Sequence, residues 1–433
     1  MASAVGARHS GDMIAQSPTL AIDQAVTAAR LAGRTVLHLG FGEAGLPVLP
    51  SLVDVLAGAA TRNGYGPVRG TPDVREAAAG WFGRRELPTS AEQVLVGPGS
   101  KALLFAVLAA VDGAVVLPCP AWVSYAAQAA LLDRTVIPVP IAADGPGGVP
   151  DPERLDEALR SARRSGIRPG VLVLTVPDNP TGTVATVEQL RDVCLVAERF
   201  GLAVVCDEIY AELCHAGTSP SAAAFLPDRT VVTSGLSKSV ALGGWRIGFA
   251  RTPDGDWGRR LHRDATGVAS EVWSSLAAPM QAVAAHVLAD PPDVLAHIAA
   301  SRRLHGRIVR TVHDGLADHG VAARPPEAGF YVYPDFGPHR ETLRAQGIAT
   351  GTDLAAWLMR EHDVATLPGV AFGEPTSALT LRLATSQLYG DTTEDRWTAL
   401  RSDAPETLPW VAGALTHLDR ALSALVRTEP ARG

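Results

Sequence analysis

The chain has 433 residues, of which 47% are hydrophobic and 19% are charged, and its formal charge is −7. This length and composition predict a soluble globular protein of roughly two or three domains with a large buried core. Basic and acidic residues are mixed along the chain without a Lys/Arg block, which argues against a nucleic-acid partner.

The N-terminal residues 1–16 lack the apolar run of a signal peptide, and we expect a flexible arm there. The longest apolar run, residues 102–111, is too short to span a membrane. The cysteines form no Cys-x-x-Cys pair, so we expect neither a metal site nor a disulfide framework. Reduced cysteines favour a cytoplasmic protein. They are Cys119, Cys194, Cys206 and Cys214.

Strand and helix patterns alternate through the middle of the chain. Apolar strands are predicted at residues 93–96, 114–117, 135–139, 171–176, 202–206, 230–233 and 247–250. Helices are predicted at residues 102–111, 152–164 and 187–200. Continuous strand hydrophobicity indicates burial on both faces, so the pattern predicts an α/β fold with a mostly parallel central sheet. Ligands of such sheets bind at the carboxyl ends of the strands.

The pattern changes near Pro291, where long helices (294–316, 353–361, 410–426) alternate with short strands (329–333, 379–384). This favours a second, smaller α+β domain. We therefore predict four segments: the flexible arm 1–16, an N-terminal segment 17–50 that packs with the small domain, a large domain 51–290, and a small C-terminal domain 291–433.

Two glycine-rich segments look like phosphate-binding motifs but lack the required context. Residues 40–45 match Gly-x-Gly-x-x-Gly after a plausible strand at 35–39. Pro47 and Pro50 follow where a helix should open, and no acidic residue follows about twenty positions on at a strand end, which disfavours a dinucleotide site. The segment Gly97-Pro98-Gly99-Ser100-Lys101 lacks the order and spacing of a phosphate loop.

The most informative pair is Lys238, in Ser234-Gly235-Leu236-Ser237-Lys238-Ser239, and Arg246, in Gly244-Trp245-Arg246-Ile247-Gly248. A lysine amine can form a Schiff base with pyridoxal 5′-phosphate, and an arginine can bind its phosphate with two hydrogen bonds. Alone, this pair proves little, because most lysines are solvated and most arginines pair with a surface carboxylate.

Further candidates follow the predicted strands. Ser100 opens a helix whose free amides can bind a phosphate, although a serine there is also an ordinary helix cap. Asn179 can donate to the phenolate oxygen O3′ of the cofactor or form an Asn-Pro turn. Asp207 can pair with a pyridinium nitrogen, and Tyr210 can bind O3′; the alternative is a capping Asp and a core Tyr.

Two aromatic residues and one arginine complete the set. Trp122 can stack on the cofactor ring or fill a core. Tyr65 lies in the glycine-rich turn Asn63-Gly64-Tyr65-Gly66-Pro67, where a large ring has little core to join. Arg382 is a charge in the middle of an apolar strand and needs an anion, either a substrate carboxylate or a structural partner.

In this order, these residues resemble those of the fold-type I enzymes that use pyridoxal phosphate, in the class I/II aminotransferase family. The chain looks most similar to bacterial aspartate and prephenate aminotransferases, from about Leu39 to about Ser386. The motifs that carry the resemblance are Asn179-Pro180-Thr181-Gly182, Asp207-Glu208-Ile209-Tyr210, and Lys238 with Gly244-Trp245-Arg246-Ile247-Gly248.

The resemblance implies a role for each residue. Lys238 carries the internal aldimine and transfers the proton, Asp207 pairs with the pyridinium, Asn179 and Tyr210 bind O3′, and Trp122 stacks on the ring.

The phosphate would be held by Gly99, Ser100 and Arg246, with a hydroxyl from Ser237 or Ser234. The usual serine three positions before the lysine is absent here.

The substrate α-carboxylate would be bound by Arg382 with help from Asn179 and the backbone of Gly42. Lys101 is counted with the cofactor-binding residues and also corresponds to a position that can bind an acidic side chain. Tyr65 would reach the phosphate in a neighbouring subunit, which implies a homodimer with shared active sites.

Three segments depart from the family pattern and leave the substrate open. The usual Gly-Glu-Pro-Asp-Phe is Gly42-Glu43-Ala44-Gly45-Leu46, residues 387–409 look like an insertion, and Arg69 is an extra cation near Tyr65.

These observations support one reaction over two alternatives. We expect an aminotransferase that moves an amino group between an L-amino acid and a 2-oxo acid with ping-pong kinetics. The same motifs would serve elimination, replacement or cyclisation of an amino acid. A cofactor-binding regulator would need a DNA-binding extension, for which the arm is too short.

Overall fold

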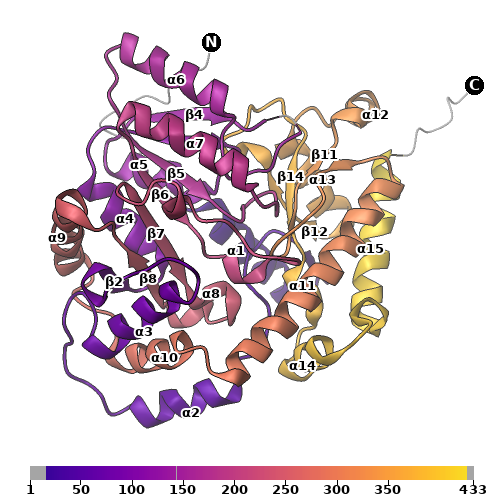
Figure 1. Cartoon of the computed structure of the whole chain (residues 1–433). Coiled ribbons are helices and arrows are strands. Elements are labelled where there is room, and N and C mark those ends of the chain that lie inside the picture. The colour runs from indigo at the N-terminus through magenta and orange to yellow at the C-terminus, as the bar shows by residue number, and fades with distance from the viewer. Residues whose placement is uncertain (1–15, 143, 427–433) are drawn as a thin grey trace, which may run out of the picture.

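The computed structural model describes residues 16–142 and 144–426 (Figure 1), so that the predicted arm lies outside the described residues except for Gln16. Its centre is a seven-stranded sheet with the order β2-β8-β7-β6-β5-β3-β4. Only β8 runs antiparallel to its neighbours, which confirms the predicted mostly parallel sheet. The strands are β2 (Val94–Gly97), β3 (Ala114–Cys119), β4 (Val136–Pro140), β5 (Pro169–Thr175), β6 (Ala203–Asp207), β7 (Thr230–Gly235) and β8 (Gly248–Arg251).

The apolar strand residues are buried on both faces of this sheet. On β5, Leu172 and Leu174 pack in one core with residues of α6 and α7, while Val171 and Val173 pack in another with residues of α4 and α5. Because side chains alternate along a strand, only a continuous apolar run can fill both cores.

Helices cover both faces of the sheet (Figure 1). The predicted helices at 152–164 and 187–200 have these same bounds, and each is capped at its N-terminus, by Asp151 and Thr186. The helices of this part are α2 (Pro50–Ala59), α3 (Pro72–Gly83), α4 (Ser100–Ala110), α5 (Val123–Leu131), α6 (Pro152–Arg164), α7 (Val187–Phe200), α8 (Leu236–Ser239), α9 (Gly255–Val272) and α10 (Ala278–Leu288).

The C-terminal part is built around the long helix α11 (Pro292–Asp318). The remaining helices are α12 (Arg340–Ala345), α13 (Gly351–His362), α14 (Thr393–Arg401) and α15 (Pro409–Val426). Short strands form three small sheets: β1 (Leu37–His38) with β12 (Val364–Ala365), β10 (Tyr331–Val332) with β14 (Leu381–Ala384) and β13 (Leu367–Pro368), and β9 (Ala322–Ala323) with β11 (Pro334–Asp335).

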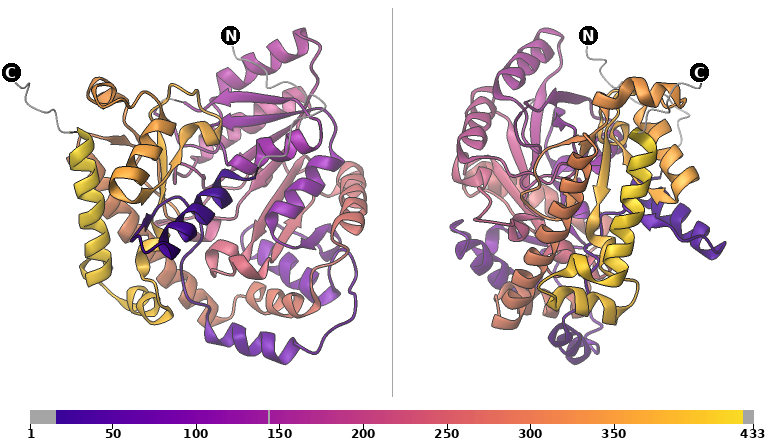
Figure 2. Two further views of the ribbon diagram at one scale, coloured as in Figure 1. Left: turned by 180° about the vertical axis from the view of Figure 1, so that it is seen from behind. Right: turned by 90° about the vertical axis from the view of Figure 1, so that its right-hand side faces the viewer.

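The N-terminal segment joins this C-terminal part. Leu37, Leu39 and Leu46 belong to the same buried cluster as Ile308 and Leu381. Figure 2 shows α1 (Pro18–Leu31), in indigo, between the C-terminal elements and the helices around the central sheet. This packing supports our proposal that residues 17–50 form one unit with the chain after residue 290, apart from residues 51–290.

Residues 40–49 contain no helix, and the first helix after Gly45 begins at Pro50. The glycine-rich segment therefore does not lead directly into a helix, as a dinucleotide site would need. Within residues 16–142 and 144–426, no helix combines the length and apolar character needed to cross a membrane.

Candidate active site

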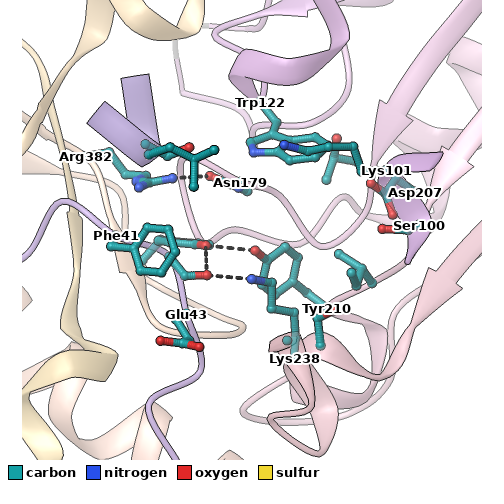
Figure 3. A pocket seen from close by; sticks show the side chains of 18 of the residues that line it. Phe41, Glu43, Ser100, Lys101, Trp122, Asn179, Asp207, Tyr210, Lys238 and Arg382 are labelled. Atoms are coloured by element: carbon teal, nitrogen blue, oxygen red, sulfur yellow. Dashed lines mark hydrogen bonds between the residues drawn. The ribbon is translucent and has the colours of Figure 1, made fainter. Parts of the chain in front are cut away.

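The carboxyl ends of the parallel strands surround a cavity of about 460 Å³. Figure 3 shows side chains from both parts of the chain pointing into it. The cavity brings together most of the predicted site residues: Gly42, Ser100, Lys101, Trp122, Asn179, Asp207, Tyr210, Ser237, Lys238, Arg246 and Arg382. Gly99, Ser234 and Tyr65 do not line it.

Lys238 lies on the short helix α8, directly after β7, and its Nζ donates to the carbonyl of Gly42 at 2.5 Å. Burial, followed by the nearby charges of Arg382 and Arg246, lowers the pKa of this amine to about 8. An amine with such a pKa is partly neutral near physiological pH, which is the form that attacks an aldehyde or takes up a proton. The chain has only two lysines, and both line this cavity.

Asp207 ends β6 as a buried carboxyl group that is only half paired. Its Oδ2 accepts a hydrogen bond from the Tyr125 hydroxyl at 2.9 Å, and that hydroxyl also lies 2.8 Å from Thr175 Oγ1. Its Oδ1 is buried without a partner. Burial raises the pKa of Asp207 to about 6. A cationic N–H donor would satisfy this oxygen and favour the charged form, so the site fits a pyridinium nitrogen.

The N-terminus of α4 and Arg246 form a cradle for an anion. Gly99 caps the helix with φ +88°, a conformation that favours glycine, and a Cβ atom there would lie 2.3 Å from Arg246 Nη2 and displace the guanidinium. Arg246 donates to the carbonyls of Gly243 at 3.0 Å and Pro98 at 3.4 Å. Among the described residues, no carboxylate pairs with it. Helix amides and an unpaired guanidinium together fit a phosphate group.

The two serines of the lysine loop differ in position. Ser237 lines the cavity, whereas Ser234 is buried and its hydroxyl donates to the backbone oxygen of Glu208 at 3.5 Å. The orientation therefore favours Ser237 as the hydroxyl beside a phosphate.

Arg382 on β14 is 1% exposed and has no carboxylate partner among the described residues. Its Nη1 donates to Asn179 Oδ1 at 3.3 Å and its Nη2 to the Gly40 carbonyl at 2.6 Å, while Nε is buried without a partner. The guanidinium carbon lies 4.9 Å from the centre of the Tyr331 ring. A structural ion pair does not explain this buried charge, and a substrate carboxylate would. Since Asn179 accepts through Oδ1, its Nδ2 is left as a donor.

Tyr331 is a site residue that sequence reasoning did not name. Its hydroxyl lies 2.8 Å from that of Tyr210 and donates to the Gly42 carbonyl at 3.4 Å. A Cβ atom at Gly42 would lie 2.1 Å from this hydroxyl, so any larger residue there would displace the Tyr331 ring. Tyr331 was inside the predicted strand 329–333, but only the pairing of β10 with β14 places it beside Arg382.

Other positions lie away from the cavity. Tyr65 is 96% exposed. Arg69 is paired with Glu92 at 2.8 Å. Residues 387–409 contain α14 and a 3₁₀ turn at Pro405–Thr407, and none of them lines the cavity. All four cysteines are free, and the described residues contain no cluster of His, Cys, Asp or Glu side chains that could hold a metal ion.

Comparisons with known proteins agree with this geometry. The family model "Aminotransferase class I and II" matches residues 34–388. An aspartate aminotransferase of Streptomyces avermitilis is 31% identical over 376 residues, covering 84% of this chain and 88% of that protein. An aspartate/prephenate aminotransferase of Thermus thermophilus is 30% identical over 364 residues, covering 82% and 89%.

The solved structures that resemble this chain include an aminotransferase as well. The aspartate aminotransferase of Thermus thermophilus with maleate superimposes with a TM-score of 0.80 at 26% identity, covering 94% of this chain and 97% of that one. The chain therefore belongs to the class I and II aminotransferase family and is an aminotransferase of fold type I.

Proposed function

We propose that the enzyme binds pyridoxal phosphate on Lys238 and transfers the amino group of a dicarboxylic amino acid, such as aspartate, to a 2-oxo acid. The observation that carries this proposal is a pair of cations, Arg382 and Lys101, that line the cavity of Lys238 without a carboxylate partner among the described residues. Each can take one carboxylate of the substrate.

Lys101 supports the dicarboxylic substrate by its surroundings. Its Nζ lies 5.1 Å from the centre of the Trp122 ring. Burial, together with the charge of Arg246, lowers the pKa of this amine. A partly buried ammonium group gains most from an anion brought by a ligand, and relatives named aspartate aminotransferase agree with this substrate class.

The described residues fit the cofactor at each of its polar groups. Asp207 would hold the pyridine nitrogen through its free Oδ1, and Asn179 and Tyr210 would donate to O3′. Ser100, Ser237 and Arg246, with the backbone at Gly99, would hold the phosphate, and Trp122 would cover the ring. When bound, pyridoxal phosphate supplies an electron-withdrawing ring that lets the α-proton of the amino acid leave.

The chain's own groups then orient the substrate and move the proton. Arg382 binds the α-carboxylate and fixes the Cα–H bond relative to Lys238, whose neutral amine takes the proton and returns it. Thr19 and Leu20 of α1 and Phe41 line the same cavity and limit the access of water.

We also propose a cytoplasmic homodimer with shared active sites. Tyr65 is 96% exposed on a glycine-rich turn and has no core of its own to join, so a neighbouring subunit would give it a contact. Four free cysteines are compatible with a reducing compartment.

The reaction and the substrate class are tested by giving the cofactor-loaded enzyme one amino acid and no oxo acid. Aspartate is expected to yield one equivalent of oxaloacetate per active site and then stop, because the amino group stays on the enzyme. Continuous release of product would instead indicate elimination or replacement.

Lys101→Ala is expected to raise the aspartate concentration for half-maximal rate about 10- to 100-fold through the lost charged hydrogen bond. The rate with alanine is expected to be unchanged.

Lys101→Arg, which keeps the charge, is the matched control for this experiment. Equal weakening for aspartate and alanine would contradict the assignment of Lys101 to the side-chain carboxylate and leave the transamination result intact.

The capture of pyridoxal phosphate by cofactor-free protein is expected to depend on pH with a break near 8. Only the neutral amine attacks, and burial lowers the pKa of Lys238 to about 8. The rate should therefore rise about tenfold per pH unit below this value and become constant above it. The measurement is the fraction of chains fixed by borohydride after a short mixing time. An increase that continues to pH 10 would show an ordinary lysine.

A further inference from the structure

A second cavity, of about 730 Å³, lies between α11, α14 and the turn after α14, and it also reaches His215 and Leu49 of the N-terminal half. None of its residues lines the active-site cavity. Figure 1 shows α14 beside the N-terminal half of α11. One wall comes from α11 and another from residues 397–405, which lie in the segment that we interpreted as an insertion. Neither of these two walls contributes a residue to the catalytic cavity.

The lining of this cavity is strongly basic. Five arginines face it, against the carboxyl groups of Asp293 and Asp403: Arg302, Arg303, Arg307 and Arg310 from α11, and Arg401 from α14. An excess of guanidinium groups around one concave space attracts and concentrates anions.

Internal carboxylates do not neutralise most of these arginines. Arg307 pairs with Glu406 at 2.5 Å, while Arg302 donates only to the backbone oxygen of Glu212, at 2.9 and 3.1 Å. Within the described part of the chain, Arg303 and Arg310 have no ion pair or hydrogen bond. Arg303, Arg307 and Arg310 are spaced by four and three residues, so they share one face of α11 and repel one another.

A buried histidine in the same lining lacks a partner. His297 is 4% exposed, and its Nε2 is buried without a hydrogen bond. Its ring packs edge-on against Trp397 with the centroids 5.9 Å apart, and the guanidinium of Arg401 lies 4.9 Å from the centre of the same Trp397 ring. Trp397 thus packs against two groups of the lining, and one of them is a buried imidazole with an unpartnered nitrogen.

We propose that this cavity binds a small polyanion, a molecule with two or more phosphate or carboxylate groups. Guanidinium groups bind both kinds of anion with paired hydrogen bonds, and several arginines on two helices suit a ligand with more than one anionic group. A volume of about 730 Å³ is ample for such a molecule.

The proposed ligand would lie next to two residues, Arg302 and His215, that contact the segments carrying active-site tyrosines. Arg302 holds the backbone of Glu212, two residues after Tyr210, and His215 Nε2 lies 2.8 Å from the carbonyl of Gly329, two residues before Tyr331. The hydroxyls of these two tyrosines meet in the catalytic cavity.

The test is calorimetric titration of the cofactor-loaded enzyme with inorganic pyrophosphate and, separately, with citrate. At least one probe is expected to bind saturably at one site per chain, and which of them binds distinguishes a phosphate from a carboxylate ligand. The variant Arg303→Ala/Arg310→Ala is expected to weaken that binding at least about tenfold, since charged hydrogen bonds are lost. Both side chains are exposed, so the fold should not depend on them. The matched control is Arg420→Ala, an exposed arginine on α15 outside the cavity.

Binding at the catalytic site is distinguished by the variant Arg382→Lys, which should leave the affinity for the probe unchanged. The proposal is overturned if neither probe binds saturably, if the double variant binds as the wild type does, or if Arg382→Lys abolishes binding. None of these results depends on which amino acid the enzyme uses.

Discussion

Replacement of Lys238 by alanine is expected to lower kcat/KM at least about 1,000-fold, because in the proposed mechanism one amine both holds the cofactor and moves the α-proton. General acid–base catalysis alone contributes about 10² to 10⁴. The lysine that binds the cofactor can be identified without ambiguity, because the only other lysine of the chain is Lys101. Borohydride reduction of the cofactor-loaded wild type should attach the cofactor to Lys238 alone, as peptide mass spectrometry can measure.

The matched control is Lys101→Arg, which should keep the label at full stoichiometry. Circular dichroism of Lys238→Ala should match the wild type, since the amine makes only one hydrogen bond, to the Gly42 carbonyl. A label on Lys101, or a Lys238→Ala enzyme that turns over at more than a tenth of the wild-type rate, would contradict the role of Lys238.

The sheet was predictable because its strands are buried on both faces and carry an unbroken apolar signal, as β5 and β6 do. Helices α6 and α7 were predictable to the residue because an Asp or a Thr caps each of them. Helix α14 was not predicted, although Thr392 and Asp395 form a capping box, because it buries only Ala399 and Leu400 and so carries little periodicity.

The cavity was predictable where its residues follow strands of one sheet, since parallel strands bring their carboxyl ends together. The place of Tyr331 in the site was missed because it depends on the pairing of the two-residue strand β10 with β14, and the sequence pattern does not show this pairing. Tyr125 was missed because its role comes from a contact with Asp207, far along the chain. The choice between Ser234 and Ser237 depends on the direction of each side chain where β7 passes into α8, which the motif does not fix.

Replacement of Asp207 by asparagine is expected to lower kcat about 100- to 1,000-fold, comparable to the loss of one preorganised charge partner in an active site. An amide cannot hold the positive charge on a ring nitrogen, so the cofactor would withdraw electrons less strongly. The matched control is Tyr125→Phe, which removes the hydrogen bond to Oδ2 and leaves the carboxylate in place. Its loss of kcat should be much smaller. Similar losses in the two variants would show that Asp207 only shapes the site.

Stability measurements on cofactor-free protein separate this catalytic role from a structural one. Burial raises the pKa of Asp207 to about 6, against roughly 3.9 in an unfolded chain. The folded protein therefore holds its proton more tightly than the unfolded chain, and the wild type loses stability relative to Asp207→Asn as the pH rises from about 4 to about 6. Above this range the difference should be constant, and thermal denaturation across it measures the change. The variant would then fold at least as well as the wild type at neutral pH while turning over far more slowly. The opposite result would be a stability of Asp207→Asn, measured relative to the wild type, that is lower at pH 8 than at pH 4. It would show that the carboxylate is needed for folding.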